Sequence, residues 1–331
     1  MPTRMLDASH PDAVAEAAQI INRGGLVAFP TETVYGLGAD ACNPIAVARI
    51  FEVKRRPAFN PVIVHVGDPG SALLYGDCAA DLAQALIHAF WPGPLTLVVP
   101  KTDLVPPVVT AGLDTVAIRM PANPVALRLI RECGRAIAAP SANPFGYVSP
   151  TEASHVSDQL TGVDLILDGG RCPVGVESTI LSLAGSRPCI LRSGGVTPEE
   201  LEKVAGPLVW STDGASRPDS PGQLARHYAT RTPLRITDAP RTSGERSLSG
   251  RVGLLSLLPP TDPERYAAVE VLSVTGDLRE AAANLFAALR RLDALGLDRL
   301  DARPFPEIGL GIAIMDRLRR CARPAGTGRA E

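Results

Sequence analysis

Short apolar runs alternate with helical patterns over the first 205 residues, and this alternation predicts an α/β domain. The predicted strands cover residues 26–29, 62–66, 95–99, 115–120, 136–139, 165–167, 180–183 and 189–191. The predicted helices cover residues 11–22, 45–53, 79–90, 124–132, 152–160 and 198–204. Because several strands follow one another without an intervening helix, we expect a twisted mixed sheet, of α/β or α+β class, rather than a purely parallel one.

The composition changes after Gly206, and a second α/β pattern follows. The stretch from Ser211 to Pro221 is rich in Ser, Gly, Asp and Pro, which is typical of a linker. Strands are predicted near 234–236, 252–257 and 269–274, and helices near 278–295 and 311–321. We therefore predict a first domain over 8–205, a linker over 206–231 and a smaller α/β domain over 232–325.

Charge and cysteine content exclude several classes of protein. The net charge of −2 argues against a general electrostatic grip on nucleic acid, although a local RNA surface stays possible. The chain has neither an apolar run of membrane-spanning length nor the apolar core of a signal peptide. Its six cysteines include no CxxC pair, and its five histidines show no metal-ligand spacing. We expect a cytoplasmic protein with free thiols and no metal of its own.

Three consecutive cations, Lys54, Arg55 and Arg56, lie between a predicted helix and a predicted buried strand. Pro57 ends the helix, and Asn60 follows closely. An α/β fold places its ligand crevice at such a junction, and a lysine beside an arginine suits a phosphate group. The alternative is a solvated helix end, whose cations favour the C-terminal helix dipole.

Four further polar clusters stand at the ends of predicted strands. They are Pro30 to Gly38, Arg119, Pro140 to Ser149, and the pair formed by Glu177–Thr179 with Arg192–Gly194. Each could be an ordinary turn, and Arg119 could pair with either a substrate carboxylate or an internal glutamate. Together they offer hydroxyl, amide and cationic groups without a Ser-His-Asp arrangement. This pattern favours positioning and charge stabilisation of a phosphorylated ligand over covalent catalysis.

These clusters resemble the signature blocks of the YrdC-like family, in the family's order. The blocks are Pro30-Thr31-Glu32-Thr33-Val34-Tyr35-Gly36-Leu37, Lys54-Arg55-Arg56-Pro57 with Asn60-Pro61, Pro140-Ser141-Ala142-Asn143, and Glu177-Ser178-Thr179. The second half, joined through Ser220-Pro221-Gly222 and His227-Tyr228, is similar to the two-domain members, L-threonylcarbamoyladenylate synthases. The resemblance implies a YrdC-like domain followed by a smaller Rossmann-like α/β domain.

The resemblance also implies the reaction and its site. L-threonine, bicarbonate or CO2, and ATP would give threonylcarbamoyl-AMP and pyrophosphate, for modification of a tRNA adenosine next to the anticodon by downstream transferase proteins. The L-threonine site would comprise Thr33, His65, Arg119 and Ser178. The ATP site would comprise Lys54, Arg56, Asn60, Thr115, Ser141, Asn143, Ser149 and Arg192, with Lys54 and Arg56 as catalytic residues and Mg²⁺ bound through the nucleotide. His227 and Tyr228 would belong to a possible lid.

Two other functions are weighed against this one. A carbamoyl-phosphate-dependent carbamoyltransferase module, as in hydrogenase maturation proteins, would normally carry acylphosphatase and Cys-rich segments, which this sequence lacks. An RNA-binding module would use the cationic cluster, but aromatic residues make up only 4% of the chain, which is unfavourable for base stacking.

On its own, an isolated histidine such as His65 is more often a satisfied core residue than a ligand-binding one.

Overall fold

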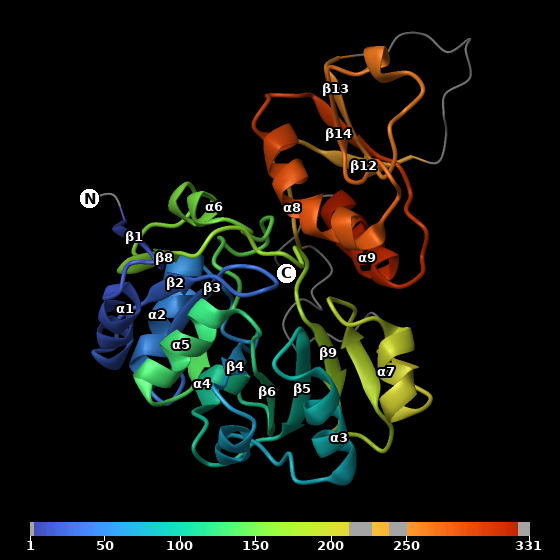
Figure 1. Ribbon diagram of the computed structural model, residues 1–331. Helices are drawn as coiled ribbons and strands as arrows, with labels where there is room; N and C mark the ends of the chain where they lie inside the picture. Colours follow the sequence, from blue (N-terminus) through green and yellow to red (C-terminus); the bar gives the residue numbers. More distant parts are fainter. Residues whose placement is uncertain (1–2, 212–226, 238–249, 324–331) are drawn as a thin grey trace, which may run out of the picture. The chain divides into compact units, whose positions relative to one another are not determined.

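The structure is a computed structural model that describes residues 3–211, 227–237 and 250–323. The chain forms two compact units, which are described separately (Figure 1). The first comprises residues 1–145 and 149–223, and the second comprises residues 146–148 and 224–331. The assignment of 206–231 as a linker and lid stays a prediction, because residues 212–226 lie outside the described part of the chain.

The first unit is built on a mixed sheet, as the strand pattern predicts. In spatial order its strands are β1 (Met5–Asp7), β8 (Leu165–Asp168), β2 (Val27–Phe29), β3 (Gly36–Asp40), β7 (Ile137–Ala138), β4 (Ile63–His65), β6 (Thr115–Arg119), β5 (Leu95–Pro100), β9 (Thr179–Ser182), β10 (Cys189–Arg192) and β11 (Val209–Trp210). Strands β4 and β6 run parallel, as do β5 and β9, whereas β7 is antiparallel to both β3 and β4. The strand direction therefore reverses several times across the sheet.

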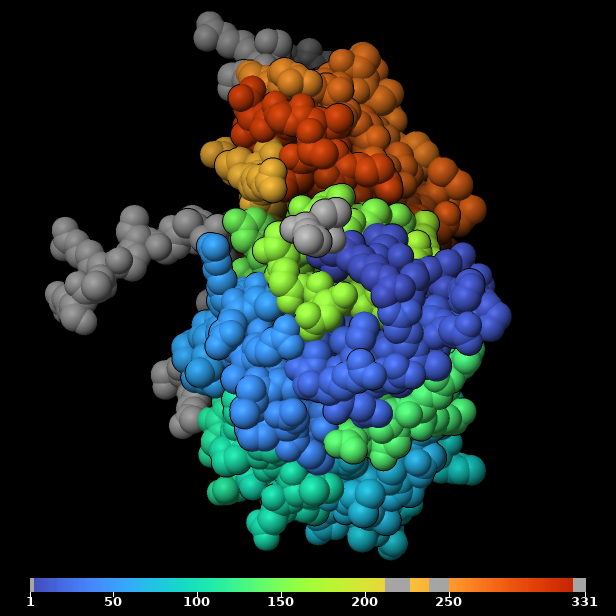
Figure 2. Space-filling view, turned by 90° about the vertical axis from the view of Figure 1, so that its left-hand side faces the viewer, coloured from blue at the N-terminus to red at the C-terminus, as the bar shows by residue number. Residues whose placement is uncertain are grey.

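Helices cover both faces of one half of this sheet. The helices of the unit are α1 (Ala13–Asn22), α2 (Pro44–Lys54), α3 (Asp81–Phe90), α4 (Pro107–Thr110), α5 (Pro124–Cys133), α6 (Ala153–Ser157) and α7 (Pro198–Ala205). Helices α1 and α5 share one apolar cluster with β2, β7 and β8, and α2 and α6 share another with β2, β3 and β8. The N-terminal segments, coloured blue, accordingly form much of the surface shown in Figure 2.

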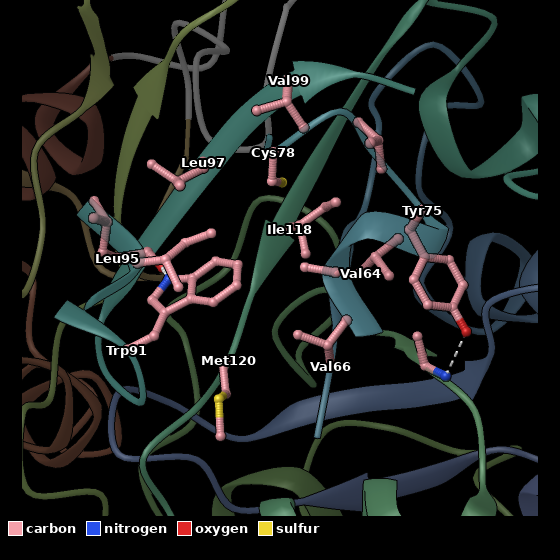
Figure 3. Close-up of a cluster of buried hydrophobic side chains, with 14 of the residues drawn as sticks. Val64, Val66, Tyr75, Cys78, Trp91, Leu95, Leu97, Val99, Ile118 and Met120 are labelled. Atoms are coloured by element: carbon pink, nitrogen blue, oxygen red, sulfur yellow. Dashed lines mark hydrogen bonds between the residues drawn. The ribbon is translucent and has the colours of Figure 1, made fainter. Parts of the chain in front are cut away.

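The other half of the sheet, from β4 to β10, packs against helices on one face. The large core cluster there joins α3 and α7 to alternate residues of the strands, such as Val64, Leu97 and Ile118 (Figure 3). Trp91 packs in the same cluster and donates from its indole Nε1 to the carbonyl of Leu95 at 2.8 Å. This packing fixes which residues of each strand turn towards the opposite face, because side chains alternate along a strand.

The opposite face of β4 to β10 carries several of the residues that are predicted to form the site. Its small apolar cluster contains only strand residues, Ile63, Val98, Ala117, Ile180 and the partly buried Leu191. Residues two positions apart along a strand share a face. The predicted site residues His65, Thr115, Arg119 and Ser178 each lie two positions from a member of this cluster, so all four belong to the same face.

The second unit contains a four-stranded sheet whose described pairings are all parallel. Its strands are β12 (Leu234–Ile236), β15 (Arg299–Ala302), β13 (Val252–Ser256) and β14 (Ala268–Val271), in that spatial order. Helices α8 (Leu278–Asp293) and α9 (Leu310–Ala322) pack with this sheet. A parallel α/β unit of this kind agrees with the smaller Rossmann-like domain that the resemblance implies. Among the described residues, no helix is long and apolar enough to cross a membrane.

The predicted elements exist, with bounds that differ by a few residues, but four strands were missed. They are β1, β3, β11 and β15. Strand β3 contains Gly36 and Gly38, which the sequence pattern assigns to a turn, and β11 extends the first sheet into the region predicted as linker. The helix predicted for 152–160 is also too long, since α6 covers only Ala153–Ser157.

Candidate functional site

The loop after β2 is held by hydrogen bonds to Thr31, and the next two residues, Glu32 and Thr33, both contact Arg119. The Thr31 hydroxyl donates to the carbonyl of Val34 at 2.6 Å and accepts from the backbone N–H groups of Thr33 and Val34. Because its only proton is used in this way, the Thr33 hydroxyl must donate to Thr31 Oγ1, at 2.8 Å. Thr33 Oγ1 is then left as an acceptor for Arg119.

Arg119, the last residue of β6, is the centre of this first group. Its Nη1 donates to Thr33 Oγ1 at 3.0 Å, and its Nε donates to the carbonyl of Gly93 at 3.2 Å. Its Nη2 lies 2.6 Å from Glu32 Oε1, in an ion pair whose side chains are both almost fully buried. The sequence leaves open whether Arg119 meets a substrate or an internal glutamate, and in this structure the internal partner is Glu32.

His65 lies directly beside Arg119, because the two residues are register partners on the parallel strands β4 and β6. Its Nδ1 lies 3.2 Å from the carbonyl of Ile63, and its ring meets Phe29 edge-on with centroids 6.3 Å apart. Burial, reinforced by the charge of Arg119, lowers the pKa of His65 to about 3. The imidazole is therefore neutral at physiological pH, so His65 adds no charge to the site.

The buried neutral state of His65 predicts a specific acid sensitivity. In the unfolded chain this histidine takes up a proton near pH 6.5, whereas in the folded chain it does so only near pH 3. Folding stability is therefore lost as the pH falls through this window, at about 1.4 kcal/mol per pH unit from this residue. His65→Gln should lose this part of the acid destabilisation in urea unfolding between pH 6.5 and 5. His88→Gln, an exposed change on α3, should keep the wild-type pH dependence, and equal slopes for all three proteins would contradict the assignment.

Lys54 and Arg56 turn inwards at the end of α2, while Arg55 turns outwards. Helix α2 begins after Asn43, whose side chain caps it, and ends at Lys54, after which Arg55 adopts a left-handed conformation with φ of 52°. The Lys54 ammonium donates to the carbonyl of Ser141 at 2.5 Å and to that of Asn143. Burial, and secondarily the charge of Arg56, lowers the pKa of Lys54 well below its usual range.

Arg56 holds the next loop and is equally buried. Its Nη2 donates to Asn60 Oδ1 at 2.7 Å and to the carbonyl of Pro61 at 2.6 Å, and its Nε donates to the carbonyl of Asn60. Burial, followed by the charge of Arg192, lowers the pKa of Arg56 to about 9. Neither Lys54 nor Arg56 has an acidic side chain within ion-pair distance in the described part of the chain.

Thr115 stands at the same end of the strand pair as Asn60. Thr115 begins β6 two residues before Ala117, and Asn60 lies three residues before Ile63, the partner of Ala117 at the start of β4. His65 and Arg119 lie at the other end, about 13 Å farther along the strands. Asn60 and Thr115 thus lie at one end of β4 and β6 and His65 and Arg119 at the other, whereas Ser178 and Arg192, which belong to different predicted groups, contact each other.

Ser178 and Arg192 occupy the neighbouring strands. The Arg192 guanidinium donates to both the carbonyl and the hydroxyl of Ser178, and the same hydroxyl lies 2.8 Å from Thr96 Oγ1. Ser149 donates to Glu177 Oε1 at 2.6 Å. The positive charge of Arg192 contributes to the lowered pKa of Arg56, so this cluster interacts electrostatically with the one that contains Lys54 and Arg56.

His227 and Tyr228 lie within the second unit, where both side chains are buried. Tyr228, in a left-handed conformation, stacks on Phe286 with ring centroids 5.5 Å apart, and the Arg317 guanidinium lies 5.4 Å from its ring centre. The bridge from Tyr147 to Ala229 ties residues 146–148 to the same segment. These contacts anchor the two residues in the second unit, and their predicted part in a lid stays a prediction.

Sequence reasoning missed the partners that hold the predicted residues in place. These are Glu32 for Arg119, Glu177 for Ser149, Thr96 for Ser178, and Phe145, whose ring lies 6.0 Å from the Arg56 guanidinium. Glu32 and Glu177 lie within the motifs quoted above, so the motifs could have identified them as residues of the site. Thr96 and Phe145 carry no comparable signal.

Comparison with known proteins identifies the family. Residues 19–194 match the Sua5/YciO/YrdC family model described as "Telomere recombination", and residues 196–323 match the model described as "Threonylcarbamoyl-AMP synthase, C-terminal domain". The chain is 44% identical to the threonylcarbamoyl-AMP synthase of Pyrococcus abyssi, over 92% of this chain and 93% of that protein. The chain belongs to the threonylcarbamoyl-AMP synthase family.

Further comparisons extend over both units. The threonylcarbamoyl-AMP synthase of Bacillus subtilis is also 44% identical, over 93% of this chain and 92% of its own length. The crystal structure of P. abyssi Sua5 complexed with L-threonine superposes with a TM-score of 0.87 and 42% identity, covering 93% of this chain and 94% of that one. Family membership makes the chain an enzyme, a threonylcarbamoyl-AMP synthase, and confirms the fold that the motifs predict.

Proposed function

We propose that the two ends of the β4–β6 strand pair bind the two large substrates of threonylcarbamoyl-AMP synthesis. L-threonine would bind beside Arg119, with Thr33, His65 and Ser178. ATP would bind beside Lys54 and Arg56, and its proposed site comprises Lys54, Arg56, Asn60, Thr115, Ser141, Asn143, Ser149 and Arg192, of which Arg192 also hydrogen-bonds Ser178 of the threonine site. The 13 Å between the ends, estimated from the strand rise, lets one extended product span both groups.

The observation that carries the ATP assignment is the burial of two cations without acidic partners. Taking an ammonium or guanidinium group out of water costs several kcal/mol unless a counter-charge is supplied. Lys54 and Arg56 are 1% and 8% exposed, and the described residues provide them with carbonyl and amide oxygens but no carboxylate. A polyphosphate would supply the missing negative charge.

The proposed reaction needs no nucleophile from the protein. The ammonium group of L-threonine first loses a proton, and the resulting amine attacks CO2 with release of a second proton, or bicarbonate with loss of water, to form a carbamate. A carbamate oxygen then attacks the α-phosphorus of ATP, and pyrophosphate leaves. Lys54 and Arg56 are proposed to stabilise the negative charge that develops on the phosphates, and this support is electrostatic.

Magnesium is proposed only as part of the nucleotide substrate. Among the described residues, no group of three or more His, Cys, Asp or Glu side chains could hold a metal ion. The side chains of the proposed ATP site are cations, hydroxyls and amides, which suit phosphate oxygens rather than Mg²⁺, and the one carboxylate that contacts them, Glu177, accepts a hydrogen bond from Ser149. A magnesium–ATP complex would therefore bring the ion, and the phosphates would be its ligands.

A pyrophosphate-release assay tests the proposed function. With ATP and bicarbonate present, L-threonine should support release, and serine or glycine should support it much less well. The expected preference has the size of a missing methyl or hydroxyl contact, about tenfold or more. Release with none of the three amino acids would overturn the proposal, and equal release with all of them would overturn the threonine assignment.

The product is proposed to serve tRNA modification in the cytoplasm, through downstream transferase proteins. A direct RNA-binding function is less well supported than catalysis, because the conspicuous cations Lys54 and Arg56 are buried. Cations that grip a nucleic acid backbone have to reach phosphates outside the protein. Lys54 and Arg56 are proposed to contact a ligand within the unit instead.

A further inference from the structure

Glu32 has a buried carboxylate for which the described part of the chain provides too few hydrogen-bond donors. The residue is 6% exposed, and its Oε1 lies 2.6 Å from Arg119 Nη2. This contact lacks hydrogen-bond geometry, however, and neither Oε1 nor Oε2 has a hydrogen-bond partner among the described residues. Arg119 Nη2 is likewise without a hydrogen-bond partner there.

An ionised carboxylate can accept about four hydrogen bonds, and leaving these sites empty in a buried place is costly. Ligand binding can offset this cost if the ligand brings N–H donors next to Arg119. Glu32 and Thr33 are adjacent in sequence and both contact the Arg119 guanidinium. A ligand that reaches Arg119 therefore also comes within reach of the Glu32 carboxylate.

Arg119 and Glu32 together carry no net charge, unlike Lys54 and Arg56, which have no acidic partner among the described residues. Arg119 contributes one positive charge and its ion-pair partner Glu32 one negative charge. Burial and the charge of Arg119 lower the pKa of His65 to about 3, and burial raises the pKa of the neighbouring Cys172 thiol to about 12, so both are neutral. A site with one charge of each sign suits a zwitterion better than an anion.

We infer that Glu32 receives the α-ammonium group of the amino-acid substrate while Arg119 receives its carboxylate. This inference rests on the proposed L-threonine site. The ammonium group brings three N–H donors to a carboxylate that lacks them, and the substrate carboxylate takes up N–H groups of Arg119. Glu32 thereby acts as a positioning and specificity residue that distinguishes amino acids from the same carboxylic acids without the amine.

The test compares L-threonine with (R)-3-hydroxybutyrate, which is threonine without its amine, by isothermal titration calorimetry. Wild-type protein should bind L-threonine more tightly. Glu32→Gln removes the negative charge but keeps the side-chain size, so it should weaken L-threonine about 10- to 100-fold, the range of a charge-assisted hydrogen bond. The same change leaves Arg119 uncompensated, so (R)-3-hydroxybutyrate should bind equally well or more tightly.

Glu132→Gln is the matched control, because Glu132 pairs with Arg128 on the exposed side of α5. Glu132→Gln should keep the wild-type preference for L-threonine. If the loss of any glutamate changed the preference, this control would change it as well. If Glu32→Gln fails to fold, Glu32→Asp keeps the charge on a shorter side chain and should retain the preference with weaker L-threonine binding. A loss of preference in Glu32→Asp would overturn the inference.

Two further outcomes separate this inference from the proposed function. An unchanged threonine-to-hydroxybutyrate ratio in Glu32→Gln, with wild-type protein still binding L-threonine, would overturn the role of Glu32 and leave the threonine site standing. Failure of the wild-type protein to bind L-threonine would overturn the site itself. Glycine has the ammonium group without the hydroxyl, so weaker glycine binding by Glu32→Gln supports the inference, and unchanged glycine binding contradicts it.

Discussion

Replacing Arg119 by methionine should both abolish L-threonine-dependent pyrophosphate release and destabilise the free protein. The change removes the proposed partner of the substrate carboxylate, which should lower kcat/KM for L-threonine by about 100-fold or more. It also leaves the buried Glu32 carboxylate without its cation. Removing one partner of a buried ion pair costs about 3–5 kcal/mol, which urea unfolding can measure.

The double variant Arg119→Met/Glu32→Gln separates these two effects. Because neither side chain is then charged, most of the lost stability should return, whereas activity should stay low. The matched control is Arg128→Met, which breaks an exposed pair with Glu132 and should cost less than about 1 kcal/mol. A single Arg119 variant as stable as wild type, or one that retains L-threonine turnover, would contradict this account of the pair.

The elements around this pair show how far the sequence could predict the site. The sequence pattern places Thr33 after one predicted strand, His65 within a second and Arg119 near the end of a third, and alternation along β4 and β6 then puts His65 and Arg119 on one face. Glu32 is within the first motif, but its partner stands 87 positions later, and no local pattern records that they meet. The choice between a substrate and an internal carboxylate for Arg119 therefore required the structure.

The missed strands have physical causes as well. Strand β3 has glycine at two of its five positions, and its neighbours leave no room for larger side chains there. A Cβ on Gly38 would approach the side chains of Ile137 and Phe29 to 2.7 Å. Strand β15 carries Arg299 and Asp301 at alternate positions, and these two pair with each other at 2.7 Å, so an interior strand of the second sheet has a polar sequence pattern. Both strands are fixed by tertiary packing rather than by local propensity.

Replacing Arg56 by glutamine should lower ATP-dependent turnover by about 100-fold or more. Glutamine can still donate one hydrogen bond in the loop that Arg56 now holds through Asn60 and Pro61, but it carries no charge. The effect therefore measures the electrostatic contribution of the guanidinium to the phosphates. Pyrophosphate release at saturating L-threonine, over a range of ATP concentrations, gives kcat and KM separately.

Arg55→Gln is the matched control for this prediction, since it makes the same chemical change one position earlier on an exposed side chain. Because the left-handed turn at Arg55 directs this residue away from the site, the variant should keep wild-type activity within about threefold. Thermal unfolding adds a readout independent of turnover. ATP should raise the Tm of wild-type protein and of Arg55→Gln by mass action, but should raise that of Arg56→Gln much less. Equal ATP-induced shifts in all three proteins would mean that the buried cation does not bind the nucleotide, because a lost phosphate contact must reduce the stabilisation that ATP provides.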